Sequence, residues 1–227
     1  TASASQKKVY GQNDSVLSYT VVPSLLAGDI FTGTLNRDQG ENIGTYSIKQ
    51  GTLSAGNKYL IIYVGASYTI TAKPITVTVD SKTKVFNTAD PVLTYSHSPS
   101  LVSGDTFNGV LTRVVGENVG TYTINQNTLG LNTNYSITFV GANFTITKAN
   151  QVITWDQIFD LGCEGETTIA LTASSNSGLP VSYISSNTNI ASVSGNVLNL
   201  LNYGSVSITA SQIGNNNYNP ATIVAST

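Results

Sequence analysis

The chain has 227 residues, of which 10% are charged, and a net charge of −2; it contains one cysteine, one histidine and no methionine. Globular proteins carry roughly 25% charged residues, and without a basic cluster the chain lacks the electrostatic footprint of nucleic-acid binding. No segment approaches the ~18 consecutive apolar residues of a membrane span, so we expect no membrane insertion. A single cysteine excludes an internal disulfide framework, and scarce oxidation-sensitive side chains favour an extracellular setting.

Two copies of one unit follow each other along the chain. The run Gly-Glu-Asn-Ile-Gly-Thr-Tyr at 40–46 returns with one substitution at 116–122, an offset of 76 residues, and the same offset relates Leu17 to Leu93. Tandem repetition at so long a period predicts small modules strung in a row. We therefore expect modules at 1–73, 74–149 and 150–227, with the first copy truncated at its amino end, so that it lacks the strand that precedes Phe86 in the second copy.

Alternating apolar and hydroxyl residues predict strands in both repeats. The first copy is expected to match the second, in which the clearest predicted strands are 75–79, 107–111, 122–124, 135–139 and 144–147. Gly141–Asn143 reads as a tight turn. Only 99–105 and its first-copy counterpart could hold a helical turn. The repeats are therefore predicted to be all-β, with a β-sandwich and a β-grasp-like fold both open.

The third module has lost the 76-residue pattern but not the strand signals. Predicted strands at 169–173, 197–201 and 206–210 alternate with turns at 178–180, 194–196 and 202–204. Many short strands at such spacing predict an immunoglobulin-like β-sandwich. The junctions at 72–74 and 148–150 are short, which leaves little freedom to bend.

The first repeat differs from the second on one outer strand face. Leu60 and Ile62 stand where the second copy has Ser136 and Thr138. Because exposed apolar faces usually have a function, we expect a neighbouring module or a partner to cover this one.

The repeats resemble the MBG-type repeat of very large bacterial surface proteins. The residues that carry the likeness are Lys8-Val9-Tyr10-Gly11, the Leu-X-X-Gly-Asp runs at 25–29 and 101–105, the Gly-Glu-Asn-hydrophobic-Gly-Thr-Tyr stretch, and 139–143. The second copy departs from the pattern with Phe86-Asn87 in place of Tyr10-Gly11. The last module is similar to a bacterial Ig-like domain through 177–183, 191–193 and 214–218.

These resemblances imply a location and a role. Such modules are found in secreted adhesins, including gliding-motility-type surface proteins of Bacteroidetes that are exported by type IX secretion. The implied function is a non-catalytic stalk or spacer on the bacterial cell surface, with neighbouring modules of the same chain as partners. A carbohydrate- or surface-binding module and an accessory region of a secreted enzyme are the alternatives, since a fold does not fix a function.

Charged residues kept in both copies are the first candidate sites. Arg37 with Glu41, and Arg113 with Glu117, predict either an ion pair that pins a turn or a clamp for a polar ligand. Asp29 and Asp105 follow a glycine, as turn-capping aspartates do. Calcium, which stiffens many adhesins, is the other interpretation, but it takes six to eight oxygens and here the aspartates stand alone.

Catalytic and covalent chemistry have weak support in the sequence. His97 has Val21 in its place in the first copy, and Cys163 has no histidine near it in sequence to serve as its base; we expect no enzyme, cofactor or metal. Lys8, Lys84, Glu41 and Glu117 recur in the two copies and could supply parts of an isopeptide crosslink. For contact with glycans or surface polymers, the aromatic candidates are Tyr63, Trp155, Tyr203 and Tyr218.

Overall fold

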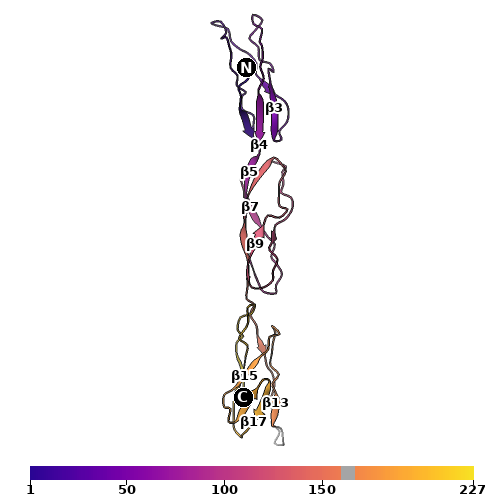
Figure 1. Ribbon diagram of the computed structural model, residues 1–227, viewed down its shortest axis with the longest axis vertical. Helices are drawn as coiled ribbons and strands as arrows, with labels where there is room; N and C mark the ends of the chain where they lie inside the picture. Colours follow the sequence, from indigo (N-terminus) through magenta and orange to yellow (C-terminus); the bar gives the residue numbers. More distant parts are fainter. Residues whose placement is uncertain (160–166) are drawn as a thin grey trace. The chain divides into compact units, whose positions relative to one another are not determined.

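The computed structural model describes residues 1–159 and 167–227, and every regular element among them is a β-strand (Figure 1). The strand β5 (Lys73–Val79) shows why: Ile75, Val77 and Val79 are buried, while the threonines between them are exposed. Period-two alternation of this kind places apolar residues on one face of a sheet. The predicted all-β class is confirmed. Cys163 lies outside the described residues.

One four-stranded sheet occurs in each repeat. Its order is β1-β4-β3-β2 in the first repeat and β6-β11-β9-β8 in the second. In the first repeat β1 pairs in parallel with β4, and β3 pairs antiparallel with β4 and β2. The strands are β1 (Gln6–Val9), β2 (Asn36–Arg37), β3 (Gly44–Lys49) and β4 (Ser67–Thr71), then β6 (Lys82–Val85), β8 (Thr112–Arg113), β9 (Gly120–Asn125) and β11 (Ala142–Thr147).

The second repeat also contains a three-stranded sheet in the order β10-β5-β7, built from β5, β7 (Tyr95–Ser98) and β10 (Tyr135–Val140). β5 pairs in parallel with β10 and antiparallel with β7. Its core contains Ile75, Val77, Leu129 and Tyr135. In the first repeat only fragments of this sheet form, such as the hydrogen bond of 2.8 Å from the Ala2 N–H to the Val64 carbonyl.

Two local predictions in the second repeat are wrong. The tight turn expected at 141–143 is absent, because β10 passes through Gly141 directly into β11, which belongs to a different sheet. The strand expected over 107–111 shrinks to one bridge, between Asn108 and Gly130. Gly109 interrupts it: its φ is +74°, and a Cβ there would lie 2.1 Å from the Thr128 carbonyl oxygen.

The segment considered for a helical turn forms a β-turn instead. The Asp105 N–H donates to the Val102 carbonyl at 3.0 Å, and Asp29 makes the same bond to Leu26 at 3.1 Å in the first repeat. Gly104 takes a positive φ of +93° between them. The described residues therefore contain no helix, which a β-grasp fold would require.

The described residues of the third module form two three-stranded antiparallel sheets, β13-β17-β16 and β15-β18-β19, and a small β12-β14 pair. Leu171, Ala191 and Leu198, together with Ile208 of the facing sheet, form one buried cluster. Two sheets that share a core in this way form a sandwich. The strands are β12 (Ile153–Thr154), β13 (Thr168–Ala170), β14 (Ser174–Ser175), β15 (Ser182–Ser185), β16 (Ala191–Ser194), β17 (Val197–Leu200), β18 (Ile208–Ser211) and β19 (Val224–Ser226).

The chain divides into two compact units, and the division runs through the second repeat. The first unit comprises Thr1–Asp80, Leu93–Thr112 and Ile124–Ala142, and the second comprises Ser81–Val92, Arg113–Thr123 and Asn143–Thr227. Each unit therefore contains one junction between consecutive sequence modules. The predicted module boundaries at 73 and 149 stay predictions.

The apolar outer face of the first repeat lies in solvent. Leu60 is 91% exposed and Ile62 is 84% exposed. The expectation that another module of this chain covers them is wrong for the described residues. Their counterparts Ser136 and Thr138 are exposed too, so the position faces outward in both copies and only its chemistry differs.

Candidate functional site

Four charged residues form a cluster at the same place in each repeat. In the first repeat Lys8 of β1 lies 2.7 Å from Asp14 and also contacts Glu41. Arg37 of β2 bonds both oxygens of Asp14, at 2.7 and 3.0 Å, and reaches Glu41 at 2.6 Å. We call these four residues the charge cluster. In the second repeat its members are Lys84, Asp90, Arg113 and Glu117.

The arginine of the cluster is completely engaged by the protein. Besides the two carboxylates, the Arg37 Nη1 donates to the carbonyls of Asp38 and Gly40, at 2.9 and 2.6 Å. All five N–H donors of the guanidinium are thus in use. Its face lies 5.0 Å from the ring centre of Tyr46. Arg113 repeats each of these bonds. This saturation argues against the interpretation of these arginines as a ligand clamp.

The cluster holds its members in their charged forms. Burial alone would lower the pKa of Lys8, but the hydrogen bonds to Asp14 and Glu41 outweigh it and raise that pKa. In the second repeat, the hydrogen bonds from Arg113 and then Lys84 lower the pKa of Asp90 from 3.8 to about 2. A protonated amine is not a nucleophile, and amide formation needs a neutral one. The electrostatics of the cluster therefore oppose an isopeptide bond.

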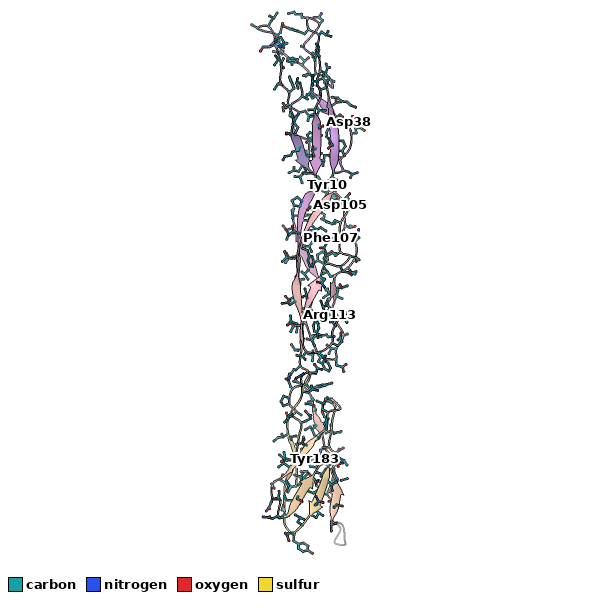
Figure 2. All side chains as sticks on the ribbon, viewed as in Figure 1. Tyr10, Asp38, Asp105, Phe107, Arg113 and Tyr183 are labelled. Carbon is teal, nitrogen blue, oxygen red and sulfur yellow. The ribbon has the colours of Figure 1, made fainter. Side chains whose placement is uncertain are left out.

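A second constellation joins the first repeat to the second. The Tyr10 hydroxyl donates to the Asp105 carboxylate at 2.9 Å, and its ring meets Tyr135 edge-on at 5.4 Å between centroids. Gly11 packs so closely on Val102 that a Cβ would lie 2.3 Å from that side chain. Figure 2 shows Tyr10 beside Asp105.

A buried asparagine completes this junction. The Asn134 side chain accepts from the Ile43 N–H at 2.9 Å and donates to the Asn42 amide oxygen at 2.9 Å. We call Tyr10, Gly11, Asn42 and Ile43 the plug, and Val102, Asp105, Asn134 and Tyr135 the socket. An amide that both donates and accepts fixes the register of the two surfaces.

The junction between the second repeat and the third module uses the same contacts. Phe86 meets Tyr218 edge-on at 5.4 Å. Asn217 accepts from the Val119 N–H and donates to the Asn118 oxygen, both at 2.9 Å. Asn87, which replaces the plug glycine, takes a positive φ of +64°, a conformation that asparagine tolerates. The turn is therefore preserved at the departure from the repeat pattern.

A short sequence signal for the socket was not recognised by sequence reasoning. Asn132-Thr133-Asn134-Tyr135 and Asn215-Asn216-Asn217-Tyr218 both read Asn-X-Asn-Tyr. In each, the first asparagine side chain accepts from the N–H of the second, at 3.0 and 2.7 Å. This local turn presents the second asparagine to the plug. Asp14 and Asp90 of the charge cluster were missed as well.

In a comparison with protein families, the MBG domain (YGX type) matches residues 1–69 and 75–145. The chain belongs to the MBG domain family. Tyr10-Gly11-Gln12 has the form that the type's name describes, and Tyr10 and Gly11 are the plug of the first junction. A search of the curated proteins finds no match. MBG repeats are generally non-catalytic structural modules that typically occur in extracellular proteins.

The predicted aromatic candidates have separate surroundings in the described residues of this MBG chain. Tyr63 packs on the core of the first repeat and donates to the Ile48 carbonyl at 2.8 Å. Trp155 packs on the core of the third module, and Tyr218 belongs to a junction. Only Tyr203 is fully exposed. Their role in glycan contact stays a prediction.

The aspartates that recur in both repeats are surrounded by donors. Asp105 accepts from Tyr10, from Tyr135 at 2.7 Å and from Asn132 at 2.8 Å. Asp29 accepts from Tyr59 at 2.7 Å and contacts Lys58 at 3.1 Å. Calcium would need further oxygen acceptors there. In the described part of the chain, no group of three or more acidic, histidine or cysteine side chains lies close enough to hold a metal.

His97, the one histidine of the chain, lies in β7. His97 is exposed, and its Nδ1 lies 3.3 Å from the Pro99 carbonyl. Its neighbour Phe107 contacts the imidazole ring at 5.2 Å between centroids. The described residues contain no helix long and apolar enough to span a membrane.

Proposed function

We propose that this chain is a non-catalytic, tension-bearing spacer of a large bacterial cell-surface adhesin. Its partners are then the neighbouring modules of the same chain, and its work is to hold an adhesive part away from the cell. The observation that supports this best is the pairing of the first and last strands of the repeat sheet. In the first repeat these strands are β1 and β4, paired in parallel.

Parallel pairing determines how the repeat meets tension. The chain enters the sheet at the start of β1 and leaves it at the end of β4. Because the strands run in the same direction, a pull on both ends slides them past each other along their axes. All ladder hydrogen bonds between 6–9 and 68–71 are then loaded together. β6 and β11 repeat this arrangement, with 82–85 facing 144–147.

The charge cluster supports the same function. Lys8 lies in the middle of β1 and is tied to Asp14 and Glu41, outside the strand. Sliding of β1 along β4 would pull the Lys8 amine out of a site where its side chain is 4% exposed. Separating a buried charge from its partners is unfavourable. The ion pairs of the charge cluster thus oppose the sliding of β1 along β4, in addition to the backbone hydrogen bonds between these strands.

We place the finer features of the chain within the same proposal. The modules extend over 1–73, 74–149 and 150–227, and the third is a bacterial Ig-like domain. Its two antiparallel sheets around Leu171, Leu198 and Ile208 support this. Export of the parent protein by type IX secretion is part of the same proposal, and the resemblance to gliding-motility-type adhesins of Bacteroidetes is what supports it.

Single-molecule stretching of the whole chain tests the proposal. We expect the two repeats to give unfolding peaks of similar, high force, because both present a sheared parallel ladder. Lys8→Met and Lys84→Met should each lower one of these peaks. Lys49→Met is the matched control, since Lys49 pairs with Asp38 on the surface, where ion pairs contribute little. Repeats that open without resolved peaks would overturn the spacer function.

A further inference from the structure

The first repeat contains a socket of its own, and none of the described residues enters it as a plug. Tyr59 and Asp29 occupy the places of Tyr135 and Asp105. The Tyr59 hydroxyl donates to Asp29 at 2.7 Å and accepts from the Leu26 N–H at 3.0 Å. In the occupied socket the matching distances are 2.7 and 2.8 Å. The polar frame that receives a plug tyrosine is thus already in place.

The surfaces that a plug would cover are exposed at this end. Leu26 is 71% exposed, whereas its counterpart Val102 is half-buried against the plug. The Lys58 side chain is 70% exposed, whereas its counterpart Asn134 is 7% exposed in the occupied socket. These differences are those expected between an open and a filled copy of one binding surface.

A cavity of about 280 Å³ lies beside Tyr59, lined among others by Thr1, Tyr19, Leu25 and Ile61. The counterparts of its apolar lining in the second repeat pack around Ile75 of β5. Ile75 is 1% exposed and faces Ile137, the counterpart of Ile61. The cavity therefore marks the place of an apolar side chain on an incoming strand.

The register shows from which side that strand arrives. The Ala2 N–H donates to the Val64 carbonyl. At the 76-residue offset these two residues correspond to Thr78 of β5 and Val140 of β10, which are paired in the second repeat. Ala2 therefore has the same register as Thr78. The positions that would face Tyr59 to Ile62 lie on the amino side of Thr1. In the filled junction, the strand that enters the socket side is the direct continuation of the chain that carries the plug, because β5 follows β4 of the first repeat without a long linker.

We propose that this end of the first repeat docks a further MBG-type module, joined through the amino side of Thr1. Its aromatic-Gly turn enters the socket of Leu26, Asp29, Lys58 and Tyr59, and the strand that connects it to Thr1 fills the cavity. The inference rests on the spacer function for its setting, an array of modules. Lys58 can only donate, unlike Asn134, so the docked module needs an acceptor at the Asn42 position, and an acidic one binds best.

A prolonged chain tests this directly. Residues 1–76 are duplicated in front of Thr1, so that the added Thr76 continues into the original repeat in register. Amide hydrogen exchange of 59–63 is compared with that of the original chain. We expect at least a tenfold slowing, and a greater one when the added copy carries Asn42→Asp. Equal exchange in both chains would overturn the proposal.

Two variants of the prolonged chain serve as controls. Tyr10→Ala with Ile75→Ser in the added copy should restore fast exchange at 59–63. Asp29→Asn in the receiving repeat, which is nearly isosteric, should weaken protection while Trp155 fluorescence stays native. Undiminished protection of 59–63 in both variants would contradict docking. Protection of 59–63 in the original chain that grows with protein concentration would also contradict the proposal, because it would identify a second copy of the chain as the occupant. The stretching peaks of the original chain do not depend on these outcomes, so the two proposals can fail separately.

Discussion

At the scale of single residues, Arg37 and Arg113 show how few charges can organise a small β module. Each guanidinium connects a carboxylate near the first strand to the carbonyls of a tight turn. The turn glycine Gly40 is pressed against Tyr46, where a Cβ would lie 2.4 Å from the ring. The arginine, the turn and the aromatic ring therefore fix one another, and the first strand is held through Asp14.

Replacing Arg113 by lysine should destabilise the chain although the charge is kept. Lysine cannot reproduce the planar fork that bonds two carboxylates and two carbonyls. We expect Arg113→Lys to lower the free energy of unfolding by about 1–2 kcal/mol, measured by chemical denaturation. Lys49→Met should leave the denaturation midpoint unchanged. An Arg113→Lys variant as stable as the original chain would contradict this account of the cluster.

The tyrosines at the first junction should titrate late. Burial and then the bond to Asp105 raise the pKa of Tyr135 from 10.0 to about 12, and the bond to Asp105 raises the pKa of Tyr10. The folded state holds these protons more tightly, so their stabilisation is present below pH 10 and is lost as the pH rises toward 12. Asp105→Asn should lower the Tyr10 pKa more than that of Tyr135, which stays buried. Tyrosinate absorbance and NMR measure both, and Asp29→Asn should move only Tyr59.

At the scale of elements, the paired strands stabilise each repeat internally, and the junction loops connect it to the next module. β1 and β6 supply the ladder and the buried lysine, while the loops at 42–43 and 118–119 supply the contacts to the next module. Both functions lie in one module because the charge-cluster glutamates Glu41 and Glu117 directly precede the plug asparagines. Loss of the cluster should therefore loosen the junction as well.

Acid should weaken the strand anchoring in a defined pH window. The pKa of Asp90 falls to about 2 in the folded chain because Arg113 and then Lys84 bond its carboxylate. A lowered folded-state pKa means that the stabilisation is complete above the ordinary value of 3.8 and is lost as the pH falls toward 2. We expect the melting temperature to drop across this window. In Asp90→Asn the drop should be smaller and the melting temperature at pH 7 lower; an unchanged pH profile would contradict it.

Asn134 and Asn217 should contribute similar free energies of stabilisation to their two junctions. Asn134→Ala leaves the Ile43 N–H without its acceptor, which costs about 1–2 kcal/mol when the site is buried. Asn217→Ala does the same to Val119. Hydrogen exchange of these two amides should accelerate, each only in its own variant. Ser96→Ala, on the exposed side of β7, is the control that should leave both amides unchanged.

Much of the element scale could be predicted from the sequence. Ile75, Val77 and Val79 alternate with threonine, and β5 formed as expected. The strand expected at 107–111 failed because Gly109 needs a positive φ, which apolar spacing does not reveal. The junction contacts escaped prediction because Asn134 and Asn217 look like ordinary turn residues. The two asparagines share the Asn-X-Asn-Tyr sequence, but they lie in modules that have no common period.

At the scale of the whole molecule, sequence modules and compact units do not coincide. The second repeat belongs partly to each unit, since its β5-β7-β10 sheet receives the first repeat and its β6-β11-β9-β8 sheet bears the plug for the third module. Small domains bury limited core, so contacts with neighbours contribute much of their stability. In the absence of an applied force, where no ladder is sheared, unfolding should then follow the units and not the repeats.

Two plug variants can separate the units. Trp155 lies in the second unit and reports on it by fluorescence. Phe86→Ala should lower the fluorescence-detected stability by about 2 kcal/mol, because a half-buried ring is removed. Tyr10→Ala should leave the fluorescence transition in place and shift only part of the circular-dichroism transition. Equal effects of both variants on Trp155 would show that the chain unfolds as a single unit.

The tetrapeptide Asn215-Asn216-Asn217-Tyr218 has an evolutionary consequence. It gives a module without the 76-residue period the same coupling that Asn132-Thr133-Asn134-Tyr135 gives an MBG repeat. A gene segment that encodes any β domain with this coupling can be spliced behind such a repeat without redesign of the border. Recombination could therefore lengthen, shorten or reorder such chains while the same contacts form at the new junctions.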